Sequence, residues 1–216
     1  MHIRTHGISL YERTIKMINE ENTGSSYTAV RTLTESALMI AVATVLSMFG
    51  LFKLPNGGSV TIGSMIPIIL ISLKYPLDWS LAAAFAYSLI QMIQGFYPPP
   101  VENIYYYTLM VLFDYVFAFS VLCLAGPLYR KFSDKWPTRV RIMIAAIICF
   151  VLRFICHFLS GMIVWGYYAP ENQPVWLYSF LYNGSYMLGE CLISGIILFL
   201  AGQMLAAILL GKKDIR

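Results

Sequence analysis

Charged residues are scarce in this chain of 216 residues: Asp, Glu, Lys and Arg make up 12% of it, whereas 58% of the residues are hydrophobic. Soluble domains carry about a quarter charged residues. The deficit excludes an ordinary soluble domain and predicts an integral membrane protein. In a membrane protein the positions of the basic residues matter more than the net charge of +4. We therefore expect no nucleic-acid partner.

Motifs for catalysis and for nucleotide or metal binding are also missing. The sequence contains no GxxxxGK[ST] phosphate-binding loop, no GxSxG nucleophile elbow and no HExxH zinc motif. Its four cysteines lie in apolar segments without CxxC spacing, which favours buried small side chains over a zinc site. His157 and Ser160 are three residues apart on one helix, but no orienting group accompanies them. We predict that the protein is not an enzyme and uses no cofactor or metal.

Six apolar segments are candidates for membrane-spanning helices, each of which needs about 20 mostly apolar residues. They cover residues 33–52, 60–73, 78–96, 104–128, 140–166 and 176–210. The second is short, contains Pro67 and follows the glycines of NGGS. It is either a loop that dips into an outward-facing cavity or an ordinary turn followed by a short helix.

The basic residues predict the orientation of these segments. With the N-terminus inside, every Lys and Arg falls in a cytoplasmic segment except Lys53, in an outer loop, and Arg153, within a span. This asymmetry and the even number of spans place both termini in the cytoplasm. The predicted fold is thus an all-α bundle of six transmembrane helices over residues 31–210, with a loose tail over 1–30 and a short tail over 211–216.

Four ionisable residues lie deep within the predicted spans, away from their ends: Asp114, Arg153, His157 and Glu190. Charges at membrane depth are costly and usually face a cavity or a partner. Arg153 and His157 have i, i+4 spacing, and Asn183 and Glu190 have i, i+7 spacing, so each pair shares one helix face. We expect the fourth, fifth and sixth spans to converge on one polar pocket that opens outward.

Two interpretations of these charges stay open. Arg153 can form a buried ion pair with Asp114 or with Glu190, which would leave the other carboxylate unpaired. The remaining groups, with Tyr115, Trp165 and Tyr178 nearby, would suit a flat ring that carries amine groups and a positive charge.

Three stretches now indicate a family. NGGSVTIGSMIPIILISL, LFDYVFAF and HFLSGMIVWGYYAPENQPVWLYSFLYNGSYMLGE resemble the thiamine-binding S components of energy-coupling factor (ECF) transporters, over roughly residues 33–200. The resemblance implies a six-helix protein of the prokaryotic plasma membrane with a vitamin pocket near its outer face. It also implies two kinds of partner, a transmembrane coupling protein and two cytoplasmic ATPases, which would account for the missing P-loop.

The resemblance also implies the residues that bind thiamine. The family's motif residues are matched by Asp114, Tyr115, His157, Trp165, Tyr178 and Asn183. We add Glu190, which is the alternative carboxylate if Arg153 neutralises Asp114. The chain departs from the family at Asp114, where a Glu is expected, and in KLPNGGSV, which lacks a matching tryptophan. A further tyrosine of the family corresponds to Tyr105, Tyr106 or Tyr107.

The first span contains SALMIAVA, in which Ala37 and Ala41 are one helical turn apart. Small residues at this spacing let membrane helices approach closely, and the resemblance implies that they dock on the coupling protein. Two other functions remain possible: the same architecture with another vitamin or a thiamine precursor, and a secondary transporter that works without an ATPase. No internal repeat is evident, which argues against the common inverted-repeat transporters.

Overall fold

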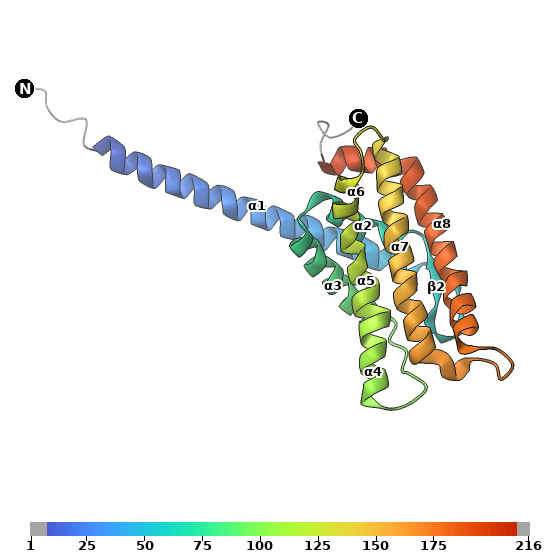
Figure 1. The fold of residues 1–216 in the computed structure, drawn as a ribbon. Coiled ribbons are helices and arrows are strands. Elements are labelled where there is room, and N and C mark those ends of the chain that lie inside the picture. The colour runs from blue at the N-terminus through green and yellow to red at the C-terminus, as the bar shows by residue number, and fades with distance from the viewer. Residues whose placement is uncertain (1–7, 211–216) are drawn as a thin grey trace, which may run out of the picture. The chain divides into compact units, whose positions relative to one another are not determined.

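The computed structural model describes the backbone of residues 8–210 and most side chains from residue 28 onward (Figure 1). The tail predicted over 211–216 lies outside the described residues. The chain divides into two compact units, Met1–Leu38 and Met39–Arg216. The elements are α1 (Ile8–Met48), β1 (Gly50–Lys53), η1 (Pro55–Gly57), β2 (Ser59–Thr61), α2 (Ile66–Lys74), α3 (Leu77–Gln94), α4 (Ile104–Met110), the π-helical η2 (Val111–Phe117), α5 (Ala118–Ser120), η3 (Val121–Leu124), α6 (Ala125–Lys131), α7 (Thr138–Ile163), η4 (Trp165–Tyr168) and α8 (Val175–Leu210).

The long apolar segments form helices close to their predicted bounds. Four helical stretches among the described residues are long and apolar enough to cross a membrane: Thr28–Met48, Ile104–Lys131, Thr138–Ile163 and Val175–Leu205. The predicted third segment is α3, whose 18 residues are too polar to be counted among these four stretches. Residues 8–30, expected to form a loose tail, are helical instead and continue into the first span as α1.

The predicted second span is not a single helix. Its first residues form β2, which pairs with β1 in an antiparallel hairpin, and α2 begins only at Ile66. A turn joins the two, in which Gly63 has a φ of 72° that favours glycine. Features of both alternatives are therefore present: Gly57, Gly58 and Ser59 line a cavity, and a turn leads into a short helix. Residues 50–52 of the predicted first span are likewise strand.

Helix α2 is short and enclosed by protein. It has nine residues, or about 14 Å, which is half of the roughly 30 Å hydrocarbon core. Pro67 lies in its first turn, where a missing N–H costs nothing, and residues 66–73 are all buried. Its contact with α6 is close enough to require glycine, since a Cβ on Gly126 would lie 1.9 Å from the carbonyl oxygen of Ser72.

The two ends of the helices differ in composition. Figure 1 shows the α6–α7 connection at one end and the α3–α4 and α7–α8 connections at the other. The first end carries Arg130, Lys131 and Lys135, whereas the opposite loops are rich in proline and aromatic residues. This segregation agrees with a cytoplasmic α6–α7 connection and outer α3–α4 and α7–α8 loops.

Candidate functional site

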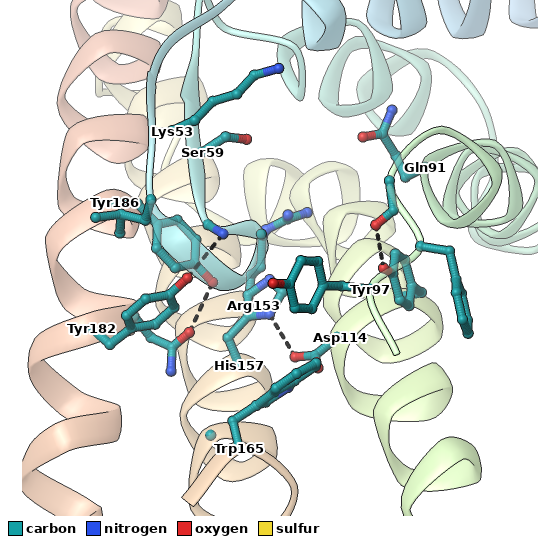
Figure 2. Close-up of a pocket in the computed structure, with 18 of the residues that line it drawn as sticks. Lys53, Ser59, Gln91, Tyr97, Asp114, Arg153, His157, Trp165, Tyr182 and Tyr186 are labelled. Carbon is teal, nitrogen blue, oxygen red and sulfur yellow. Dashed lines mark hydrogen bonds and ion pairs between the residues drawn. The ribbon is translucent and has the colours of Figure 1, made fainter. Parts of the chain in front are cut away.

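A cavity of about 590 Å³ opens between the hairpin, α3, η2, α7 and α8 (Figure 2). Gly95, Phe96 and Tyr97 of the α3–α4 loop and Trp165 of η4 line it, so the cavity lies toward the end that bears the aromatic loops. Arg153 and Phe119 line it as well. On α7 the lining runs from Arg153 to Gly161, eight residues apart, which is about 12 Å of helix.

Asp114 lies at the centre of the hydrogen bonds in this cavity. It belongs to η2, a π-helical stretch of seven residues, and such stretches are frequent at functional sites. One carboxylate oxygen lies 3.0 Å from Nδ1 of His157. The other accepts hydrogen bonds from Oγ of Ser160 at 2.6 Å and from Nε1 of Trp165 at 2.8 Å. Asp114 therefore positions the imidazole and the indole while it supplies a negative charge to the cavity.

His157 is left with one ring nitrogen for another partner. Because Nδ1 faces a carboxylate, we assign the proton to Nδ1, which makes Nε2 an acceptor. Within the part of the chain that the structure describes, the buried Nε2 atom has no hydrogen-bond partner. His157 thus offers a lone pair to an N–H or O–H donor.

One aromatic wall surrounds Trp165. Its ring stacks on Tyr168 with centroids 6.3 Å apart and planes 15° apart. Tyr97 meets it from the α3–α4 loop at 5.9 Å with a tilt of 54°. The hydrogen bond from Trp165 to Asp114 fixes the orientation of the indole, so an aromatic face and a carboxylate lie together. This combination favours a cationic ring.

The other aromatic wall is a row of tyrosines on α8 at successive i, i+4 positions. Tyr178 and Tyr182 stack at 5.9 Å, and Tyr186 follows Tyr182 at 6.0 Å in an edge-to-face arrangement. Asn183 lies beside this row, where its Oδ1 accepts from the Tyr186 hydroxyl at 2.9 Å and its Nδ2 donates to the Ser179 carbonyl oxygen at 3.0 Å. Figure 2 shows Tyr182, Tyr186 and His157 facing the same space.

Of the two interpretations of the buried charges, the structure does not contain the ion pair: among the described residues, none joins Arg153 to Asp114 or to Glu190. Its guanidinium instead lies 3.9 Å from the ring centroid of Phe119, and its Nε and Nη1 atoms have no hydrogen-bond partner. Asp114 points toward His157 and Trp165, and Arg153 remains a buried cation on the cavity wall.

Glu190 does not line the cavity, contrary to its predicted role in binding. Its side chain is buried, and one carboxylate oxygen accepts a hydrogen bond from the backbone N–H of Thr61 in β2. The reason is its place on α8, two turns beyond Asn183, where the helix faces the hairpin. Glu190 therefore anchors the hairpin.

Six of the seven predicted binding residues do line the cavity: Asp114, Tyr115, His157, Trp165, Tyr178 and Asn183. Sequence reasoning missed Gln91, Tyr97, Tyr182 and Tyr186. The i, i+4 spacing from Tyr178 would have identified Tyr182 and Tyr186, whereas Tyr97 lies in a loop without periodicity. Tyr105, Tyr106 and Tyr107 are absent from the lining, and Tyr97 is the loop tyrosine that reaches it. The Tyr115 hydroxyl donates to the Gly95 carbonyl oxygen at 2.8 Å, which ties this loop to η2.

The predicted partner-binding residues are not among those that line the cavity. Ala37 and Ala41 are both exposed, one turn apart on α1, so they present the same face of that helix. A face that docks on a partner must be exposed, and a face that contacts only lipid is exposed as well. The exposure of the two alanines therefore does not distinguish these two roles.

The comparisons with known proteins agree with one another. The model of the family described as thiamine transporter protein (Thia_YuaJ) matches residues 33–209. The thiamine transporter ThiT of Bacillus subtilis (strain 168) is 34% identical over 178 residues, which cover 78% of this chain and 88% of that protein. ThiT of Lacticaseibacillus paracasei is 27% identical over 154 residues, or 66% and 75% of the two chains. The solved structure of ThiT from Listeria monocytogenes has the same fold, with a TM-score of 0.63 at 24% identity over 82% of this chain and 96% of that one.

Proposed function

This chain belongs to the thiamine transporter protein family, and from that membership we propose that it captures thiamine from outside the cell as the substrate-binding subunit of an ATP-driven uptake transporter. It is an all-α, multi-pass protein of the cell membrane. Its ligand would enter the cavity from the end that bears the aromatic loops.

The observation that carries the proposal is the set of hydrogen bonds from Asp114 to His157 and Trp165 within an aromatic cavity. Thiamine joins a cationic thiazolium ring to an aminopyrimidine. The thiazolium would lie against Trp165, where aromatic faces and the Asp114 carboxylate attract a cation. The amine of the pyrimidine would donate to Nε2 of His157, the acceptor that has no partner in the described structure.

The remaining lining residues complete the site. Tyr178 would stack on a ring of the ligand from the α8 wall. Asn183 would hydrogen-bond the pyrimidine, and Tyr115 would close the side next to the α3–α4 loop. We assign Glu190 no contact with thiamine, because it bonds to the hairpin instead.

Release into the cell would need an ECF module, composed of a transmembrane coupling protein and two cytoplasmic ATPases. Ala37 and Ala41 are proposed to contact the coupling protein, since small side chains on one face allow close packing of membrane helices. Replacement of both alanines by leucine should abolish uptake in cells but leave thiamine binding by the isolated subunit unchanged.

The test is a titration of detergent-purified protein with thiamine, followed by intrinsic tryptophan fluorescence. Saturable quenching is expected because Trp165 lies in the cavity wall. Riboflavin and biotin serve as negative controls, and the isolated pyrimidine fragment distinguishes a receptor for a thiamine precursor. A folded protein that does not respond to thiamine contradicts the proposal. Thiamine accumulation in liposomes that contain this chain alone would indicate a secondary transporter instead.

A further inference from the structure

A cluster of basic residues lies at the end of the helices opposite the cavity, and thiamine binding does not use it. With one aromatic residue it forms what we call the inner patch: Lys74, Arg130, Lys131, Lys135, Trp136 and Arg139. These residues come from the C-terminal ends of α2 and α6, the α6–α7 connection and the first turn of α7. Nη1 of Arg130 lies 3.5 Å from the carbonyl oxygen of Leu73, so the ends of α6 and α2 are adjacent.

Four of the five basic residues of the inner patch present an exposed positive charge. Arg130, Lys131, Lys135 and Arg139 are exposed, and no ion pair in the described structure joins any of the four to a carboxylate. The carboxylate of the α6–α7 connection, Asp134, pairs with the buried Arg141 instead. Arg141 also donates to the Tyr129 hydroxyl at 3.2 Å, which holds it away from the exposed cluster.

Two aromatic contacts place this charge beside the apolar surface of the helices. The guanidinium of Arg139 lies 5.0 Å from the ring centroid of Phe199, which is 42% exposed on the membrane-crossing part of α8. Trp136, 45% exposed, stacks on Phe132 at 5.9 Å. Tryptophan concentrates at the boundary between lipid tails and water, and basic side chains there keep their heads at headgroup level.

We propose that the inner patch binds the phosphate groups of anionic phospholipids in the cytoplasmic leaflet. A phosphate oxygen accepts charge-assisted hydrogen bonds from the guanidinium of Arg139 and from the ammonium group of Lys131. Phe199 lies against Arg139, and Trp136 precedes Arg139 by three residues, so both exposed rings offer surfaces that an acyl chain can cover. Charge alone would set the membrane orientation, but the arginine held over a lipid-facing ring also makes a site for a headgroup.

The experiment measures lipid binding by native mass spectrometry on the full-length chain, with phosphatidylglycerol and phosphatidylcholine as probes. Lys131→Gln/Arg139→Gln removes two charges of the inner patch. The matched control, Arg13→Gln/Lys16→Gln, removes two basic residues of α1. About 1 kcal/mol for each basic residue near an anionic surface corresponds to a loss of affinity for phosphatidylglycerol of about 30-fold in the first variant. Binding of phosphatidylcholine, and thiamine quenching as a check of folding, should not change.

Three results would overturn the proposal. The wild-type chain could bind both lipids equally, or both double variants could lose phosphatidylglycerol to the same extent, which would reflect net charge without a site. The inner-patch variant could also keep its lipid but lose its assembly with cytoplasmic ATPases, which would make this surface a contact for an acidic protein.

Discussion

Replacement of Gly161 by alanine is predicted to damage the thiamine site through the packing of two helices. Gly161 lies on α7 against α8, and an added Cβ would lie 2.1 Å from Oγ of Ser179 and 2.8 Å from Nδ2 of Asn183. Atoms that are not bonded to each other do not approach this closely, so α7 and α8 must separate or both side chains must move. Asn183 lines the cavity, so the clash would change the shape of the proposed binding site.

The magnitude follows from the bonds that must change. Ser179 donates to the Phe158 carbonyl oxygen at 2.7 Å, and Asn183 donates to the Ser179 carbonyl oxygen at 3.0 Å. Overpacking of this kind costs about 1–3 kcal/mol of stability. A misplaced Asn183 would lose the hydrogen bond proposed for it with the ligand, worth about 0.5–1.5 kcal/mol, which would weaken thiamine affinity by up to about tenfold.

The assay is a thiamine titration by tryptophan quenching, together with a thermal melt in the same detergent. Gly195→Ala on α8 is the matched control, because its Cβ would meet no atom within 4 Å, and it should bind thiamine like the wild type. Adding Ser179→Ala to Gly161→Ala removes the Oγ clash and should restore part of the affinity. A Gly161→Ala chain with unchanged affinity and melting temperature would refute the reasoning.

Three further predictions concern other contacts. Trp165→Ala should weaken thiamine binding by about 1–3 kcal/mol in a titration, because it removes a stacking face, whereas Trp165→Phe should lose less because it keeps a ring. Glu190→Ala leaves the Thr61 N–H unpaired in a buried site, so the melting temperature should fall. Glu190→Gln retains an acceptor and should melt near the wild type. Equal losses of melting temperature in the two variants would exclude the anchoring role. Gly126→Ala forces α2 and α6 apart at the Ser72 carbonyl and should reduce the yield of folded protein in size-exclusion chromatography far more than Gly202→Ala, where the added methyl meets nothing.

The helices were predictable because membrane helices are long and apolar. The predicted bounds of α7 and α8 differ from the observed ones by at most three residues. The hairpin and α2 were not, since a segment buried in protein and a segment exposed to lipid are equally apolar. Residues 60–73 therefore read as a short span, although α2 is buried along nearly its whole length. Only the NGGS glycines indicated an irregular backbone.

In the candidate site, the face of a helix on which a residue lies was predictable, whereas contacts between helices were not. Helical spacing placed His157, Trp165 and Asn183 on inward faces, which the cavity lining confirms. Spacing within one helix gives no distance to another helix, so the sequence could not decide whether Arg153 forms an ion pair. Asp114 lies in a π-helical stretch and contacts His157, and no feature of LFDYVFAF predicts that helical geometry.

The half-length α2 has a consequence for the distance that a ligand must travel. Along α7 the cavity lining runs from Gly161 inward to Arg153, about 12 Å, which is more than a third of the roughly 30 Å hydrocarbon core. A ligand at the inner end of this lining would have crossed that part of the lipid barrier on binding alone. Helix α2, about 14 Å long, ends at Lys74 of the inner patch, so under the proposed function release into the cell would require protein at that end to move.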